Sequence, residues 1–254
     1  MNAVPQLAQA WRVAALSMMA PHELHQVLSS DPQDAAIWVE AAAACGICEA
    51  QIRLGRMLLE GDGLAKDLRG AFACFLCAAE SSNADAQNML GRCHENGWGT
   101  AVNCESAVRC YRQAAEAGLA WAQYNYGHML LDGAGIERDR KAAFIWYERS
   151  AAQGHARAMN LLARCYEEGW GIPRSPAAAR DYYRSSAEGG YFRGAFNYAS
   201  ILAGEGNIAD ATTWFERALV NATEPTRSHI LSMITRHKSQ EIRGIALRLS
   251  PTIA

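Results

Sequence analysis

The chain has 254 residues, of which 50% are hydrophobic and 20% are charged. This composition lies near the average of globular proteins and excludes an intrinsically disordered chain. A formal net charge of -2, from 24 basic and 26 acidic residues, gives no electrostatic footprint for DNA, RNA or an anionic membrane. No window approaches about 18 consecutive apolar residues, so the sequence predicts no membrane insertion.

The N-terminal segment contains one apolar stretch, residues 13–20, and a single basic residue, Arg12, precedes it directly. A secretory leader has a more basic start, and this apolar run is at the short limit for one. We therefore expect a cytoplasmic protein, with a periplasmic or secreted protein as the alternative.

Residues 1–49 predict a degenerate N-terminal capping repeat. They keep Trp38 and Gly46 of a pattern that returns every 36 residues further along, but they place His25 and Val27 where that pattern has its turn glycines. Terminal repeats of a solenoid are often atypical in this way.

Residues 50–193 predict four full repeats, with the boundaries 50–85, 86–121, 122–157 and 158–193. Written in rows of 36, the chain aligns a bulky residue followed by a small one, at Leu54-Gly55, Leu90-Gly91, Tyr126-Gly127 and Leu162-Ala163. A fixed period of this length indicates stacked structural repeats.

Each repeat is expected to form two helices joined by a turn. A glycine pair such as Gly97 and Gly99 suits that turn, because glycine enters left-handed backbone conformations without a Cβ clash. The bulky residues of the second helix need small residues opposite, such as Gly91 in the first helix. The second helices are expected to begin after N-cap side chains that accept a backbone hydrogen bond, namely Asp67, Asn103, Asp139 and Ser175.

The C-terminal part departs from the 36-residue period. Residues 194–224 form a row shortened by four residues, closer to an ordinary tetratricopeptide repeat, and residues 225–254 predict one or two closing helices. Such helices cover the apolar end that the last repeat would otherwise expose.

Taken together, the residues form the pattern A-x-x-x-L-G…G-x-G…A-x-x-W-Y-x-x-A-A-x-x-G, which residues 122–154 follow most fully. This pattern resembles the Sel1-like repeat, a relative of the tetratricopeptide repeat. The resemblance is strong over residues 50–193 and implies an all-α, right-handed superhelix of about six helical hairpins and a closing helix. It also implies a surface that holds another protein, with no catalysis and no cofactor.

Two cysteine pairs offer the main chemical alternative, because Cys45 and Cys48, followed by Cys74 and Cys77, superficially suit a tetrahedral zinc ion. The repeat register favours another interpretation, since Cys74 stands where other repeats have packing residues. We expect these cysteines to be reduced and part of the core, with no metal bound.

The first helices carry a recurring polar position directly after the small residue, which holds arginine in three of the four full repeats and histidine in the other. Three residues before the small residue, on the same face, the repeats after residue 85 have asparagine or aromatic side chains, which suit a peptide backbone, a carboxylate or an apolar anchor. The alternative is an ordinary solvated face, with pairs such as Arg92 and Glu95 on one helix. The candidate peptide-binding residues are Arg56, Asn88, Arg92, Trp121, Tyr124, His128, Asn160, Arg164 and Phe196.

The sequence thus predicts a monomeric, non-catalytic adaptor that binds a protein or peptide. Two other classes stay open: a small-molecule or cell-wall-ligand binder, since some relatives are linked to β-lactams, and a regulator that acts by self-association. The first needs a closed pocket and an activated nucleophile, and the second needs an exposed apolar surface.

Overall fold

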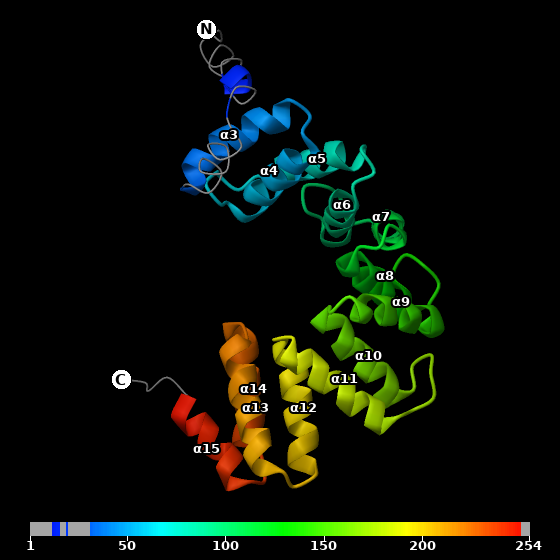
Figure 1. The fold of residues 1–254 in the computed structure, drawn as a ribbon, viewed down its shortest axis with the longest axis vertical. Coiled ribbons are helices and arrows are strands. Elements are labelled where there is room, and N and C mark those ends of the chain that lie inside the picture. The colour runs from blue at the N-terminus through cyan, green and yellow to red at the C-terminus, as the bar shows by residue number, and fades with distance from the viewer. Residues whose placement is uncertain (1–11, 16–18, 20–30, 250–254) are drawn as a thin grey trace. The chain divides into compact units, whose positions relative to one another are not determined.

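The computed structural model describes residues 12–15, 19 and 31–249, with only the backbone described for residues 245–249, and the first-repeat positions His25 and Val27 lie outside these ranges. Every regular element labelled in this part is a helix (Figure 1), so the predicted all-α fold is confirmed. None of the described helices is long and apolar enough to cross a membrane. The elements are α3 (Pro32–Ala44), α4 (Cys48–Glu60), α5 (Leu68–Ala79), α6 (Ala84–Asn96), α7 (Cys104–Glu116), α8 (Ala120–Asp132), α9 (Arg140–Ala152), α10 (Ala156–Glu168), α11 (Pro176–Glu188), α12 (Phe192–Gly204), α13 (Ile208–Asn221), α14 (Glu224–Thr235) and α15 (Gln240–Leu249).

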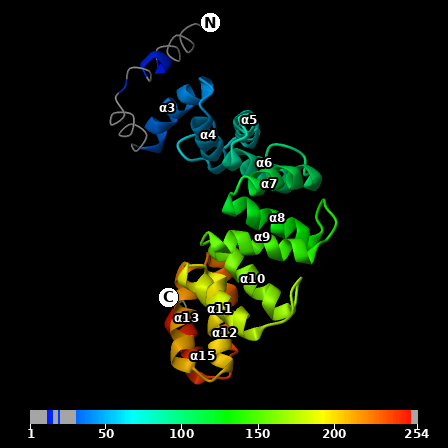
Figure 2. The ribbon, with the colours of Figure 1, turned by 45° about the vertical axis from the view of Figure 1, so that its right-hand side comes forward.

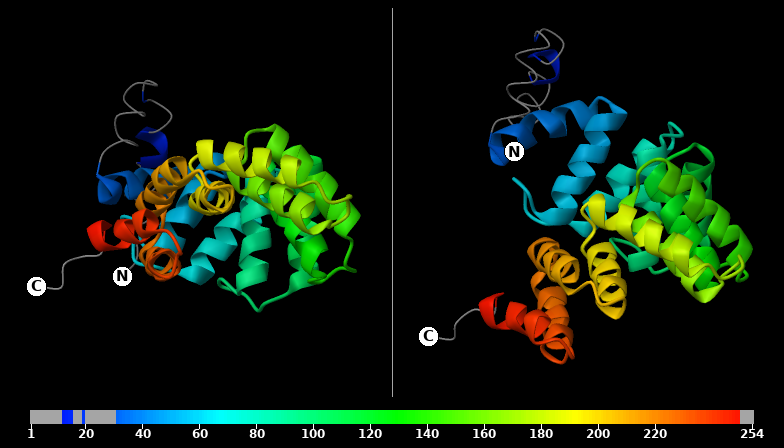
Figure 3. Two further views of the ribbon diagram at one scale, coloured as in Figure 1. Left: turned by 90° about the horizontal axis from the view of Figure 1, so that it is seen from below. Right: turned by 60° about the horizontal axis from the view of Figure 1, so that its bottom comes forward.

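The chain divides into two compact units, and the division falls at the end of α8. Unit 1 comprises residues 1–129 and 133–137, and unit 2 comprises residues 130–132 and 138–254. In unit 1 each consecutive pair of helices, from α3 and α4 to α6 and α7, packs together, as Figure 2 shows. The same holds in unit 2 from α9 to α15, and there α15 also packs against α13 (Figure 3).

Helices therefore alternate in role along the chain. We call α4, α6, α8, α10 and α12 the first helices, and α5, α7, α9, α11 and α13 the second helices, of their repeats. Helices α14 and α15 follow the last repeat, in the segment 225–254 for which the sequence analysis expects one or two closing helices.

The ends of the helices follow the sequence prediction closely. Helices α4, α6, α8 and α10 each end at a glycine in the left-handed conformation, for example Gly97 with φ of 71°. The second helices begin at the predicted caps, and the Asn103 side chain accepts a hydrogen bond from the backbone N–H of Ser106 at 2.9 Å. Ser175 caps α11 in the same way, and Pro176 occupies the first helical position, where its missing N–H costs nothing.

Large and small side chains meet inside each hairpin. Tyr111 of α7 is fully buried, and a Cβ atom added to Gly91 of α6 would lie 2.7 Å from its ring. Phe75 faces Gly55 in the same manner one repeat earlier, with a corresponding distance of 2.6 Å. The expected fit of bulky residues against glycine is confirmed at these two positions.

This fit makes the size of residue 91 critical. Gly91→Leu is expected to lower the free energy of unfolding by about 1 to 3 kcal/mol, because the buried Tyr111 ring blocks a branched side chain. Gly91→Ala is the matched control and should cost less, since Ala163 holds the same register opposite Tyr183. Urea unfolding followed by circular dichroism measures both, and equal stability of the leucine variant and the wild type would contradict the packing described here.

The second glycine of each turn has a role that the sequence did not reveal. A Cβ atom on Gly99 would lie 2.0 Å from the carbonyl oxygen of Leu68, at the start of the preceding second helix. The same holds for the other three full repeats. A Cβ atom added to Gly63, Gly135 or Gly171 would lie 2.2 to 2.4 Å from the backbone of Pro32, Cys104 or Arg140, respectively. The turns are therefore contacts between repeats as well as links within one repeat.

The cysteines differ from the prediction. Cys45 and Cys77 are exposed and Cys48 and Cys74 are half-buried, so the expectation that all four belong to the core is wrong. The reason is that Cys77 lies toward the solvent side of α5, in register with the polar Gln113 and Arg149. All eight cysteines are free thiols, and no three His, Cys, Asp or Glu side chains in the described ranges are grouped so as to hold a metal ion.

Candidate functional site

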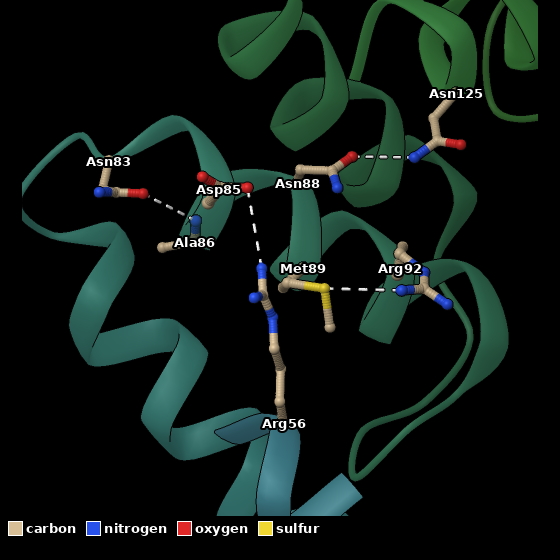
Figure 4. Close-up of polar contacts among 8 residues, drawn as sticks. All are labelled: Arg56, Asn83, Asp85, Ala86, Asn88, Met89, Arg92 and Asn125. Atoms are coloured by element: carbon tan, nitrogen blue, oxygen red, sulfur yellow. Dashed lines mark hydrogen bonds and ion pairs between the residues drawn. The ribbon is translucent and has the colours of Figure 1, made fainter. Parts of the chain in front are cut away.

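In unit 1 the candidate residues gather on the first helices α4, α6 and α8. Figure 4 shows Arg56 reaching from α4 to Asp85 at the start of α6, where the two side chains form an ion pair of 3.8 Å. Both side chains are about half exposed, so the pair contributes little to stability. It shows, however, that polar side chains of successive first helices reach one another on this face.

Asn88 is placed differently from the prediction. It is only 6% exposed, and its side-chain oxygen accepts a hydrogen bond from the Asn125 amide at 2.8 Å (Figure 4). In unit 2, Asn160 is 4% exposed and accepts a hydrogen bond from Asn197 at 3.0 Å. These asparagines therefore join successive first helices, and the sequence analysis missed their partners, although Asn125 and Asn197 also stand 72 residues apart.

Trp121, Tyr124 and His128 form a row of aromatic side chains on α8. The ring centroids of Trp121 and Tyr124 lie 6.4 Å apart and those of Tyr124 and His128 lie 6.1 Å apart, both in edge-to-face geometry. Trp121 is 45% exposed, whereas the other two are partly buried. All three residues are among the peptide-binding candidates from the sequence, and the structure brings them together on one helix.

Arg92 and Arg164 hold the same register in units 1 and 2, and each lies over the tryptophan of its own turn. The guanidinium carbon of Arg92 lies 4.8 Å from the ring centroid of Trp98, and that of Arg164 lies 4.9 Å from the ring centroid of Trp170. Trp98 in turn packs on the core of unit 1. A cation over an aromatic face is stabilised by the ring quadrupole.

The glutamates three residues after these arginines do not pair with them. Glu95 accepts a hydrogen bond from the buried Tyr111 hydroxyl at 2.5 Å, and Glu167 accepts one from Tyr183 at 2.6 Å. Burial, together with the adjacent glutamate, raises the pKa of both tyrosines far above the ordinary value, so that both hydroxyls stay protonated and donate. The alternative of a solvated Arg92–Glu95 pair is therefore wrong.

Phe196 is partly buried and packs against the core of unit 2. Its ring packs edge to face on Phe215, with centroids 5.5 Å apart, inside the cluster that holds the last repeat together. Only part of its side chain is left to face a partner.

A cleft in unit 1 bears on the small-molecule alternative. It has a volume of about 580 Å³ and lies between α3, α4 and α5, where Ile37, Leu54, Cys74 and Cys77 are among the lining residues. This volume would accommodate a small ligand. The Cys74 thiol is not activated, however, because burial raises its pKa and so favours the protonated form over the nucleophilic thiolate.

A family model described as the Sel1 repeat matches the chain five times, at residues 14–47, 48–83, 84–119, 122–155 and 156–191. Among solved structures, a Sel1 repeat protein from Oxalobacter formigenes superposes with a TM-score of 0.76 at 24% identity, covering 89% of this chain and 98% of that one. The Escherichia coli protein c5321, titled a protective antigen displaying an SLR fold, gives a TM-score of 0.66 at 25% identity and covers 87% of this chain. The match spans only 50% of the c5321 chain.

The immunity protein Pa5087 from Pseudomonas aeruginosa has a TM-score of 0.54 at 14% identity, covering 79% of this chain and 74% of that one, which shows a shared fold alone. No curated protein sequence matches the chain.

Proposed function

Because the chain belongs to the Sel1 repeat family, we propose that it is a monomeric, non-catalytic adaptor that binds a partner protein or peptide on the exposed face of its first helices. Proteins of this family are generally protein-interaction scaffolds, and a scaffold needs a surface with apolar anchors and unsatisfied polar groups. The proposed contact residues are Arg56, Arg92, Trp121, Tyr124 and His128 in unit 1, and Arg164 and Phe196 in unit 2. Asn88 and Asn160 act in this proposal by holding neighbouring first helices in register.

The observation that carries the proposal is the exposure of Trp121. An indole that is 45% exposed leaves apolar surface in water on a helix whose other large residues are mostly buried or partly buried. Tyr124 and His128 extend that surface along α8. Tryptophan and tyrosine are enriched among the residues that dominate binding energy in protein interfaces.

Trp121→Ser tests this proposal, because removal of a half-exposed side chain leaves the core intact. The probe is a set of 12-residue peptides selected for binding to the full chain from a random display library. We expect Trp121→Ser to weaken their binding by about tenfold or more, as measured by fluorescence anisotropy. Leu76→Ser is the matched control, since Leu76 is also 45% exposed in unit 1 but lies on the second helix α5.

Hydrogen exchange on the bound complex locates the surface independently of any substitution. The first helices α4, α6 and α8, or α10 and α12, should exchange more slowly with a peptide bound. Protection of the second helices, or a loss of binding in Leu76→Ser alone, would assign the partner to the opposite face and overturn the proposal. Size-exclusion chromatography over a range of concentrations tests the competing self-association class.

A further inference from the structure

Two of the repeats carry a feature that the other two lack. Residues 88–99 and 160–171 share the pattern N-x-L-x-R-C-x-E-x-G-W-G, whereas the repeats before and between them have leucine at the glutamate position and Asp62 or Ala134 at the tryptophan position. Those repeats nevertheless form the same first helices with the same left-handed glycine ends. The fold therefore does not require the arginine, glutamate and tryptophan in combination.

In each of these two repeats the arginine side chain has no carboxylate partner among the described residues. Glu95 and Glu167 instead accept hydrogen bonds from the buried tyrosine hydroxyls, as described above. Among the described residues, neither Arg92 nor Arg164 has a carboxylate partner, in contrast to Arg56 with its Asp85. The only side-chain hydrogen bond of Arg92 within the described residues goes to the Met89 sulfur at 3.6 Å, which is a weak acceptor (Figure 4).

The tryptophan places each guanidinium for binding. A guanidinium carbon 4.8 to 4.9 Å from the ring centroid is held against the aromatic face by the ring quadrupole, and guanidinium N–H groups are donors that a carboxylate can accept from. The edge of a guanidinium matches a carboxylate through two parallel hydrogen bonds. Arg164 is exposed and Arg92 is half-buried, so an anion can reach both.

We propose that Arg92 on Trp98, and Arg164 on Trp170, each receive a side-chain carboxylate from an acidic segment of the partner protein. This inference rests on the proposed function and adds the chemistry of the partner. Charge complementarity selects an acidic segment, because the two cations lack internal anions. Aspartate or glutamate side chains fit better than a terminal carboxylate, since the chain repeats the site and a partner chain has one C-terminus.

The test uses the display-selected peptides and a pair of double variants. Arg92→Gln with Arg164→Gln removes both proposed sites. Arg112→Gln with Arg184→Gln is the matched control, because these arginines are also 72 residues apart but pair with Glu116 and Glu188 on their own second helices. The peptides are made in three forms: as selected, with every Asp and Glu changed to Asn and Gln, and with an amidated C-terminus.

We expect the selected peptides to be rich in Asp and Glu, and their affinity to fall by about tenfold or more in the Arg92 and Arg164 variant. The control variant should change it by less than about twofold, and the amide-substituted peptides should lose as much affinity as the double variant does. Selection of neutral peptides that still need Trp121 would overturn this inference and leave the adaptor function standing. The inference would also be overturned if C-terminal amidation abolished binding, or if both double variants lost the same amount of affinity. A library that yields no binder would overturn both the inference and the proposed adaptor function.

Discussion

Gly171→Ala is expected to lower the free energy of unfolding by about 2 to 5 kcal/mol, which makes it one of the most damaging single-methyl additions in the chain. Two costs combine at this position. Gly171 has φ of 75°, where a Cβ atom costs about 1 to 2 kcal/mol. The same Cβ would also lie 2.3 Å from the Arg140 carbonyl oxygen and 2.8 Å from the Lys141 Cα atom, and backbone atoms at the start of a helix cannot move aside as a flexible side chain can.

Gly154→Ala separates the two costs. Gly154 lies in the same unit with φ of 81°, but an added Cβ meets nothing within 4 Å. It should therefore lose only the conformational part, about 1 to 2 kcal/mol. Urea unfolding of the two variants and the wild type, read by circular dichroism, gives the difference, and hydrogen exchange would locate it between α9 and α10. Equal destabilisation by both substitutions would show that the approach of Gly171 to α9 contributes nothing.

These glycines show which part of the fold the sequence predicts. The 36-residue period, the left-handed first glycine and the Asn103-type caps are local signals, because each depends on residues within one hairpin. The close approach of Gly99 to Leu68 is a contact between repeats, and a pattern of glycines alone does not distinguish it from a simple turn. A second glycine that recurs in all four full repeats was the available signal, since one glycine is enough to end a helix.

In the candidate site, too, the sequence predicts features that depend on a single helix and misses those that depend on a neighbouring helix. Register alone identifies Arg56, Arg92, Arg164 and the aromatic row on α8, because helical spacing fixes which residues share a face. It does not show that Asn88 is buried or that Glu95 turns to Tyr111, because both depend on a neighbouring helix. The alternative of a solvated helix face paired Glu95 with Arg92, since the two are three residues apart. A buried tyrosine hydroxyl competes better for that carboxylate than a solvated guanidinium does, because leaving the hydroxyl unpaired in the core costs more.

A second large effect is expected from pH, through the histidine that caps α10. The Nδ1 atom of His155 accepts a hydrogen bond from the backbone N–H of Ala158 at 3.2 Å, which requires an unprotonated nitrogen. Burial, and to a lesser extent the neighbouring Arg157, lowers the pKa of His155 from its ordinary value of 6.5 to about 4. Between these values the unfolded chain binds a proton that the folded chain does not, so stability is lost as the pH falls from about 6.5 toward 4.

His155→Asn is expected to remove this pH dependence while it keeps the cap. The chain supplies the precedent, because Asn83 stands two repeats earlier at the same register and caps α6 through a 3.1 Å hydrogen bond from Ala86. From about pH 7.5 to about pH 5, the free energy of unfolding of the wild type should fall by about 1 to 2 kcal/mol more than that of the variant. The reason is that in this window only the wild type gains a proton at position 155 when it unfolds. His229→Asn, at an exposed histidine of α14, is the control and should leave the wild-type difference unchanged. Urea unfolding at the two pH values measures all three proteins, and an equal loss in the wild type and His155→Asn would mean that the acid sensitivity of the fold arises elsewhere.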